Sequence, residues 1–188
     1  MSKRIIVGIS GASGVIFGIE ILKNLTELGY ETHLVMTEAA RQNICLETDY
    51  SVESVGALAA TVHNNDDLTA PLASGSFITM GMIVAPCTIK SLSGIAHSYS
   101  SNLLIRAADV CLKERRKVVL LVRETPLHQG HLRLMSLATE MGALILPPMP
   151  AFYHGPKTID DLIRQTVGKV LDYFQIDHQL FRRWEGRP

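Results

Sequence analysis

A turn rich in glycine and serine follows an apolar strand and opens a helix within the first thirty residues. Residues 7–14 spell Val-Gly-Ile-Ser-Gly-Ala-Ser-Gly. Glycine lets the backbone turn tightly and approach a ligand closely, and the unpaired N–H groups at a helix start bind anions. Open α/β sheets hold phosphorylated ligands with a strand, a glycine-rich turn and a helix in this order. The turn therefore predicts an α/β fold with a phosphate-binding site after its first strand.

Apolar strands and amphipathic helices alternate along the rest of the chain. Strands are expected at residues 4–9, 31–36, 82–85, 117–122 and 143–146. Helices are expected at 15–28, from about 38, and at 51–60, 89–96, 102–114, 128–141 and 158–174, with loops at 63–69 and 72–76. Such alternation is typical of a parallel sheet covered on both faces. We expect a three-layer, Rossmann-like or flavodoxin-like α/β fold with an open, mostly parallel sheet, forming one domain over residues 1–188.

Composition excludes several classes of protein. Of 188 residues, 47% are apolar and 19% are charged, and 18 basic residues balance 18 acidic ones to a net charge of +0. This balance argues against binding to nucleic acid or to an anionic membrane surface. No apolar run is long enough to span a membrane, and the N-terminus lacks a signal-peptide pattern. Three separate cysteines, and histidines that do not cluster, predict a cytoplasmic protein without a metal site.

Polar and charged side chains follow the carboxyl ends of the expected strands. Ligands of parallel sheets bind at these ends, so the side chains there are candidates for one site. They are Ser10, Gly11, Ala12 and Ser13 after the first strand, Thr37 and Glu38 after the second, residues 86–91 after the third, Arg123 and Glu124 after the fourth, and Phe152, Tyr153 and His154 after the fifth. Among them, Arg123 is suited to hold phosphate with two hydrogen bonds, and Glu124 to act as a base or to orient that cation.

The glycine-rich turn departs from three better-known motifs. A dinucleotide-binding turn needs glycine where Ser10 stands, and an acidic residue where Thr37 ends the second strand. No lysine follows as in a Walker loop, and Ala12 replaces the last glycine of a nucleophile elbow. We therefore favour a mononucleotide phosphate site, with a purely structural turn as the alternative.

The residues after the third strand allow both a functional and a structural interpretation. Thr88 and Ser91 bracket Lys90 at a helix start, where hydroxyls, free N–H groups and the helix dipole favour an anion. Thr88 is equally suited to be an ordinary N-cap residue. Cys87 is interpreted as a small buried apolar residue, because no histidine stands beside it to activate the thiol.

Two later helices carry further candidates. Arg106, Asp109 and Lys113 share one helix face, which predicts either a binding surface or a solvated stripe of ion pairs. The last helix is expected to begin at Thr158, a favoured N-cap residue. The spacing of its apolar residues puts Lys169 on the outer side of that helix.

Six short motifs are spread over nearly the whole chain. They are G-I-S-G-A-S-G, the A-S-G-S loop at 73–76, P-C-T-I-K-S, R-A-A-D followed by K-E-R-R, V-R-E-T-P-L, and P-A-F-Y-H. This set resembles the flavin prenyltransferases of the UbiX type. The resemblance implies metal-independent transfer of a dimethylallyl group from dimethylallyl phosphate to N5 and then C6 of reduced FMN. It also implies that the prenylated FMN serves UbiD-type decarboxylases, including one in ubiquinone biosynthesis.

The resemblance implies a role for individual residues. FMN is expected to be held by Gly11, Ala12, Ser13, Thr37, Thr88, Ile89, Lys90, Ser91 and Arg123. Dimethylallyl phosphate is expected to be held by Tyr153 and Lys169, with Arg106, Lys113 and Glu124 around its phosphate. The expected catalytic residues are Glu124, Arg106 and Lys113, together with Ser13 and Glu47, which match positions near the flavin ring.

Three of the matches are imperfect. Thr37 and Thr88 stand where serine is usual, and Lys169 stands where arginine is frequent. Lysine keeps the charge but cannot form arginine's two parallel hydrogen bonds to phosphate, so the substitution bears on the affinity for the donor. The family's homo-dodecamer, with active sites at subunit contacts, implies that residues from about 158 to 188 take part in such contacts.

Fixed cations suit this chemistry, because ionisation of an allylic phosphate leaves negative charge on the phosphate. We hypothesise that the departing phosphate, held beside Glu124, also removes a proton during ring closure. One alternative is a flavin-dependent decarboxylase of the cysteine decarboxylase type, which residues 88–91 disfavour because they lack that family's asparagine. Another is a non-catalytic, FMN-binding accessory protein.

Overall fold

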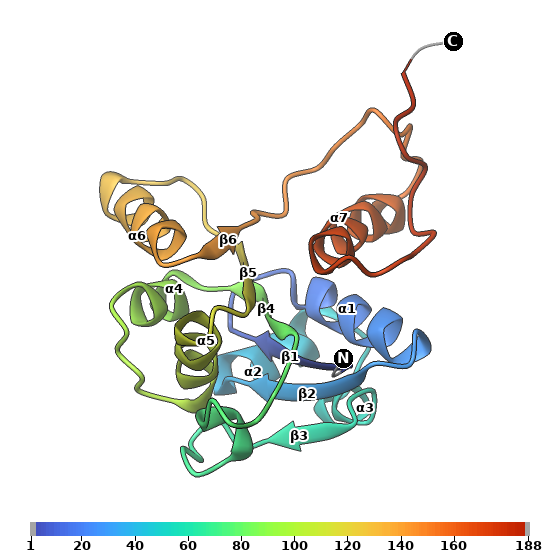
Figure 1. Ribbon diagram of the computed structural model, residues 1–188. Coiled ribbons are helices and arrows are strands. Elements are labelled where there is room, and N and C mark those ends of the chain that lie inside the picture. Colours follow the sequence, from blue (N-terminus) through green and yellow to red (C-terminus); the bar gives the residue numbers. More distant parts are fainter. Residues whose placement is uncertain (1–2, 187–188) are drawn as a thin grey trace.

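Six parallel strands form one sheet in the computed structural model, which describes residues 3–186 (Figure 1). Along the sheet they follow the order β3 (Thr61–His63), β2 (Glu31–Met36), β1 (Arg4–Ile9), β4 (Gly81–Cys87), β5 (Lys117–Val122) and β6 (Ala143–Ile145). The chain builds outward in one direction from β1 to β3 and in the other from β4 to β6. The strand order therefore reverses between β1 and β4, which is where open α/β sheets bind ligands.

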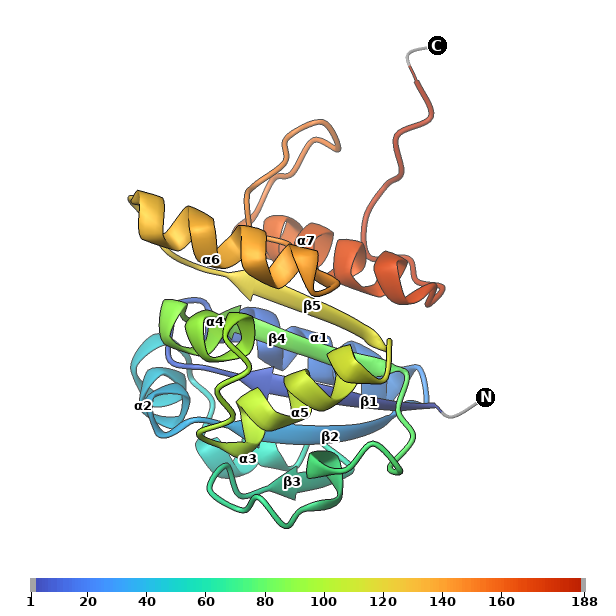
Figure 2. The ribbon, with the colours of Figure 1, turned by 60° about the vertical axis from the view of Figure 1, so that its left-hand side comes forward.

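Helices cover both faces of the sheet and give the predicted three layers (Figure 2). One core contains side chains of α1 (Val15–Glu27), α2 (Glu38–Glu47), α3 (Val52–Gly56) and α7 (Ile159–Phe174); the other contains those of α4 (Ile89–Ala96), α5 (Leu103–Lys113), α6 (Gln129–Glu140) and the short 3₁₀ helix η1 (Pro71–Ala73). The predicted α/β fold is confirmed. Within residues 3–186 no helix is both long and apolar enough to cross a membrane.

Successive residues of the central strand β1 face opposite layers. Ile5, Val7 and Ile9 belong to the core that α1 and α7 cover, whereas Ile6 belongs to the core that α4 and α5 cover. All four side chains are buried. A strand that is apolar on both faces needs helices on both, which explains why the sheet is sandwiched.

Threonine is the N-cap residue of three helices. Thr37 and Thr88 each accept a hydrogen bond from the N–H three residues later, at the starts of α2 and α4. Thr158 does the same for α7, and the Asp161 side chain accepts from the Thr158 N–H, so the predicted N-cap is a complete capping box. The first two caps fix the starts of α2 and α4 directly after β2 and β4.

The prediction of a helix over residues 51–60 is wrong in its second half. Helix α3 ends at Gly56, and the short strand β3 follows from Thr61 to His63, the residue at which the expected loop begins. Thr61 and Val62 pair with His33 and Leu34 of β2. These β-branched residues gain a strand partner, and the chain leaves the helix after Gly56 to reach it.

Strand β4 also differs from its predicted limits. It continues through Pro86 to Cys87, whereas proline was expected to end it after Ala85. Its pairing with β5 shifts register between Val84 and Cys87, so Pro86, which has no N–H, lies outside the regular ladder. The Pro86 carbonyl still accepts a hydrogen bond, from Ser10 N at 3.2 Å.

Candidate functional site

The carboxyl ends of neighbouring strands lie side by side at one edge of the sheet, the carboxyl edge. Thr37 N donates to Ile9 O at 3.1 Å, which joins the ends of β2 and β1. Arg123 N donates to Cys87 O at 3.1 Å, which joins the ends of β5 and β4. The structure therefore brings together the turn after β1, Thr37, residues 88–91 and Arg123.

Ser10 joins the ends of β1 and β4. Its hydroxyl donates to Pro86 O at 2.9 Å and accepts from Thr88 N at 2.8 Å, and the residue is 1% exposed. The Thr88 hydroxyl caps α4 by accepting from Ser91 N at 3.0 Å, and it donates to Ser91 Oγ at 3.0 Å. These three hydroxyls thus hold the first turn of α4 in place, and the N-cap interpretation of Thr88 is confirmed.

The turn after β1 packs tightly against α2. A Cβ on Gly11 would lie 2.2 Å from the Cβ of Ala39, so the turn has no room for a side chain there. Gly14 has a φ of 96°, and its N–H donates to Glu47 Oε2 at 2.7 Å. Glu47, at the end of α2, therefore lies at the start of α1, beside the exposed residue Ser13.

Three helix N-termini, those of α1, α2 and α4, open at the carboxyl edge. The first N–H groups of a helix have no partner within the helix, and the helix dipole adds a positive potential. Lys90, in the first turn of α4, and Arg123, after β5, are exposed cations at the same edge, while Ala12 and Ile89 lie in the adjoining turns. N–H groups and cations are donors that bind phosphate esters, so the residues predicted for FMN fit its phosphate.

Glu124 follows Arg123 just beyond β5. Its Oε1 accepts a hydrogen bond from Thr125 N at 2.9 Å, and its side chain is exposed. Among the residues that the structure describes, Oε2 has no hydrogen-bond partner. The carboxylate is therefore oriented by one bond while the other oxygen is free to accept a proton.

Arg106 and Lys113 lie on α5 and are paired there. Arg106 Nη1 is 2.8 Å from Asp109 Oδ2, and Arg106 Nε donates to Ala73 O at 3.2 Å. Lys113 pairs with Glu114. Helix α5 ends shortly before β5 begins, so a strand about 20 Å long separates Lys113 from the carboxyl edge. Of the predicted stripe, the ion pair between Arg106 and Asp109 is present, whereas Lys113 pairs with Glu114. One chain does not bring Lys113 to the residues predicted to bind FMN.

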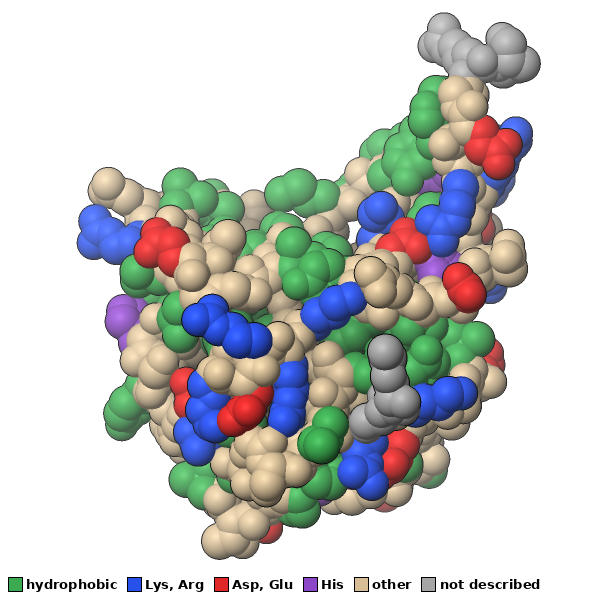
Figure 3. Space-filling view, viewed as in Figure 1, with side chains coloured by type: hydrophobic (Ala, Val, Ile, Leu, Met, Phe, Trp, Pro, Cys, Tyr) green, Lys and Arg blue, Asp and Glu red, His purple; other side chains and the backbone are tan. Residues whose placement is uncertain are grey.

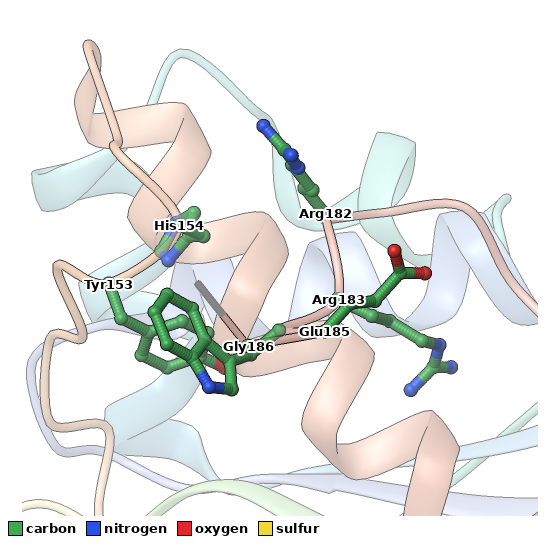
Figure 4. A pocket seen from close by; sticks show the side chains of 7 residues that line it. Tyr153, His154, Arg182, Arg183, Glu185 and Gly186 are labelled. Carbon is green, nitrogen blue, oxygen red and sulfur yellow. The ribbon is translucent and has the colours of Figure 1, made fainter. Parts of the chain in front are cut away.

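A hollow of about 730 Å³, the tail hollow, lies near the C-terminus (Figure 4). It is lined by Tyr153 and His154, from the arm between β6 and α7, and by residues 182–186. The Tyr153 hydroxyl accepts a hydrogen bond from Gln165 Nε2 at 3.3 Å. The carboxyl-edge residues do not line this hollow, and the arm projects from the body of the molecule in Figures 1 and 2. Tyr153 and the carboxyl edge are thus separate places in one chain.

Lys169 lies on the outer side of α7, as the apolar spacing predicts. Its side chain is 51% exposed, and its Nζ is 3.8 Å from Asp172 Oδ2. Asp172 has a closer partner in Arg183 of the C-terminal tail, whose Nη2 lies 2.7 Å from Oδ1. The ammonium group of Lys169 is therefore only loosely paired.

The sequence did not reveal that residues of the C-terminal tail line the tail hollow. The ring of Trp184 lies 6.3 Å from that of Tyr153, with the planes at 80°. Both ring nitrogens of His154 are buried and have no hydrogen-bond partner within the described part of the chain. The one available signal was the cluster F-R-R-W at 181–184, which has neither helical nor strand periodicity.

Burial raises the thiol pKa of two of the three cysteines. It raises the pKa of Cys87 to about 12 and that of Cys111 to about 11, so both thiols stay protonated. The interpretation of Cys87 as a buried apolar residue is confirmed. Over residues 3–186, no three side chains of His, Cys, Asp or Glu are grouped so that they could hold a metal ion.

Known proteins match the chain over nearly its whole length. A family model described as Flavoprotein matches residues 1–171. The flavin prenyltransferase UbiX of Thauera aromatica is 61% identical over 183 residues, which are 97% of this chain and 94% of that protein.

Two solved structures are similar in sequence and in fold. AnUbiX, crystallised with FMN and dimethylallyl pyrophosphate, is 49% identical with a TM-score of 0.98, and the match covers 100% of both chains. A dodecameric, FMN-dependent UbiX-like decarboxylase from Escherichia coli is 49% identical with a TM-score of 0.95, covering 97% of this chain and 100% of that one. The chain therefore belongs to the flavoprotein family and, within it, to the flavin prenyltransferases of the UbiX type.

Proposed function

We propose that this protein transfers a dimethylallyl group from dimethylallyl phosphate to reduced FMN, at N5 and then at C6. The observation that carries the proposal is the carboxyl edge: three helix N-termini and two cations meet there, in a chain 61% identical to a flavin prenyltransferase. Reduced FMN supplies the nucleophilic nitrogen and carbon, and the donor supplies the allylic carbon.

The carboxyl edge is proposed to hold FMN. Backbone N–H groups at the helix starts and the cations bind the phosphate, because both favour a dianion. Glu47 and Ser13, at the start of α1, are proposed to lie near the reacting ring. The full set of proposed FMN-binding residues is Gly11, Ala12, Ser13, Thr37, Thr88, Ile89, Lys90, Ser91 and Arg123.

The donor site is proposed to form between copies of this chain. Tyr153 and Lys169 bind dimethylallyl phosphate, together with Arg106, Lys113 and Glu124. The separation of Lys113 from the carboxyl edge by the length of β5 supports an active site shared between subunits. One solved relative is dodecameric, and we propose the same assembly here, with residues from about 158 onward in the contacts. Residues 187–188 of that segment lie outside the described residues.

Charge stabilisation is the main task proposed for the protein. Cleavage of the allylic C–O bond leaves the bonding electron pair on the phosphate, and fixed cations stabilise that charge where water is excluded. Arg106, Lys113 and Lys169 supply these charges, so the reaction is proposed to need no metal. Glu124, oriented by the Thr125 N–H, is proposed to share a proton with the departing phosphate, which acts as the base in ring closure.

The test is anaerobic incubation of the protein with reduced FMN and dimethylallyl phosphate, followed by mass spectrometry of the flavin. We expect a flavin heavier by one dimethylallyl group. Dimethylallyl pyrophosphate serves as a second donor, since a solved relative was crystallised with it. A bound flavin of unchanged mass with both donors would contradict the proposal and favour an accessory or decarboxylase function.

Glu124→Gln tests the role proposed for Glu124 beside the departing phosphate. The glutamine keeps the shape and the bond from Thr125 N but cannot take up a proton, so product formation should fall about 100-fold or more while flavin binding is retained. An unchanged rate of every step of flavin modification would remove Glu124 from the mechanism.

The product is proposed to serve a UbiD-type decarboxylase, in the cytoplasm. The three cysteines support a reducing compartment, because all are free thiols. Restoration of activity to a flavin-free UbiD-type apoenzyme by the reaction mixture would test the proposed recipient.

A further inference from the structure

The C-terminal tail, residues 177–186, is seated directly on the backbone of α7. A Cβ on Gly168 would lie 2.5 Å from Phe181 Cε1 and 2.7 Å from His178 Cε1. The His178 side chain is only 2% exposed. Because the helix has no side chain at this position, the tail lies against it at the residue that precedes Lys169.

One carboxylate, that of Asp172, ties the tail to α7. Arg183 contacts it with two nitrogens, Nη2 at 2.7 Å from Oδ1 and Nη1 at 3.2 Å from Oδ2. His178 Nε2 lies 3.2 Å from the same Oδ1. The Asp172 side chain is 23% exposed, so these contacts are partly shielded from water. Figure 3 shows basic, acidic and histidine side chains side by side over this C-terminal part of the molecule.

The pairing of Asp172 with the tail also affects Lys169. Both carboxylate oxygens have closer partners in the tail, and Lys169 Nζ remains 3.8 Å away. The Arg183 guanidinium, followed by His178, holds the pKa of Asp172 below its usual value, so the carboxylate stays charged. Lys169 is thus left with an exposed ammonium group that an incoming phosphate can bind.

The anchored tail completes the tail hollow. Trp184 directly follows Arg183, and its ring stands edge-on to that of Tyr153, with the ring centroids 6.3 Å apart. Tyr153 is itself fixed through its hydroxyl by Gln165, which is 6% exposed. The position of Trp184 in this pair therefore depends on the contacts that hold the tail.

We propose that Asp172 is a positioning residue for the prenyl-donor site. It anchors the tail through Arg183 and His178, so that Trp184 stands beside Tyr153, and these two partners keep the carboxylate from pairing closely with Lys169. The inference rests on the proposed function for the role of Tyr153 and Lys169, and on the structure alone for the anchoring of the tail. Asp172 acts through these residues and does not itself touch the donor.

The test uses the full-length protein and two readouts. Trp184 is the chain's one tryptophan, so its fluorescence quenching by acrylamide reports on the tail before any donor is added. Steady-state kinetics then give KM for dimethylallyl phosphate and kcat. The variants are Asp172→Asn, Arg183→Gln on the exposed tail, and Asp172→Glu as the conservative replacement. Asp160→Asn, an exposed carboxylate of the same helix, is the matched control.

Asp172→Asn and Arg183→Gln should both increase the quenching of Trp184 and raise the donor KM about three- to five-fold, with smaller changes in kcat and in FMN binding. Asp172→Glu, which keeps the carboxylate, should show smaller increases in both the quenching and the donor KM. The proposal is overturned if both variants match Asp160→Asn in quenching, or if quenching rises while the donor KM does not. If the wild-type protein makes no prenylated flavin, the proposed function fails, whereas the quenching experiment still decides whether Asp172 anchors the tail.

Discussion

The two parts of the proposed active site are built in different ways. The carboxyl edge consists of strand ends joined by backbone hydrogen bonds and by the hydroxyl of Ser10, which is 1% exposed. The tail hollow consists of residues beyond the last strand, where Tyr153 is 50% exposed and Trp184 61% exposed. The proposed FMN site is thus part of the core packing, whereas the tail's share of the proposed donor site depends on a few contacts at the surface.

Because of this difference, substitutions in the two regions should affect different properties of the protein. A change at the carboxyl edge disturbs strands that carry the core, so stability and FMN binding should fall together. A change in the tail disturbs contacts to one helix, so donor binding should fall alone. Four experiments test this separation, from the largest expected effect to the smallest.

Gly11→Ala should have the largest effect. The new Cβ would lie 2.2 Å from the Cβ of Ala39, which forces the turn away from α2. Overpacking of this kind costs about 1–3 kcal/mol of unfolding free energy, and we expect the purified protein to lose most of its flavin. Flavin absorbance and the thermal midpoint measure both. Gly56→Ala is the control, since its Cβ would meet only Val62 Cγ2 at an ordinary 3.5 Å; full flavin content in Gly11→Ala would contradict the expectation.

Ser10→Ala should have the next largest effect. The substitution removes the hydroxyl that accepts from Thr88 N and donates to Pro86 O. Loss of these buried hydrogen bonds should lower the free energy of unfolding by about 1–3 kcal/mol. Because Thr88 caps α4, the FMN dissociation constant should rise as well. Urea unfolding and flavin titration measure the two effects, with the exposed Ser136→Ala as the control. Loss of stability with unchanged FMN affinity would show that the two properties are separable at this edge.

Gly168→Ala should affect the tail alone. The new Cβ would displace Phe181 and His178, so the donor KM should rise a few-fold. Alanine is the better helix former by about 1 kcal/mol, so α7 itself is not weakened. The thermal midpoint and the FMN affinity should therefore stay close to those of the wild type. A fall in both, like that expected for Gly11→Ala, would mean that the tail belongs to the core.

The same difference decides which features the sequence could reveal. Lys169 on the outer face and the Thr158 cap follow from patterns within a few residues, and both are confirmed. The alternation of strands and helices predicted the fold, and the strand ends predicted most of the residues that meet at the carboxyl edge. The prediction was wrong for Tyr153 and His154, which line the tail hollow because the chain leaves the sheet after β6. Local pattern and tertiary structure agree in these places because each element is long and apolar enough to dictate its own position.

Features that depend on distant contacts could not be predicted. The bond from Ser10 to Pro86 joins residues 76 positions apart, and Thr61 enters the sheet only because β2 offers a free edge. The tail has no periodic pattern, and its place is set by the bare backbone at Gly168 and by the charge of Asp172. Such contacts follow from the fold once it has formed.

Acid should separate the sheet from the tail, although with the smallest effect. In the sheet, His33 Nδ1 lies 3.0 Å from His63 Nε2, and burial lowers the pKa of both imidazoles below their ordinary 6.5. The folded state then binds fewer protons than the unfolded state, so stability is present above about pH 6.5 and is lost as the pH falls through the lower folded values. His63→Gln should flatten this part of a stability profile measured by urea unfolding.

The contact between Asp172 and Arg183 should respond to acid only at lower pH. The pKa of Asp172 is lowered from an ordinary 3.8, chiefly by the Arg183 guanidinium, so its contribution is present above that value and is lost below it. Above about pH 5 the charged Asp172 should therefore keep Arg183, so the quenching of Trp184 should stay below that of Asp172→Asn while the unfolding free energy already declines. The same measurement on Asp172→Asn, whose tail is released at every pH, gives the upper limit of quenching. If quenching and stability change together above pH 5, the tail and the sheet form one cooperative unit, because contacts that unfold independently need not share a titration.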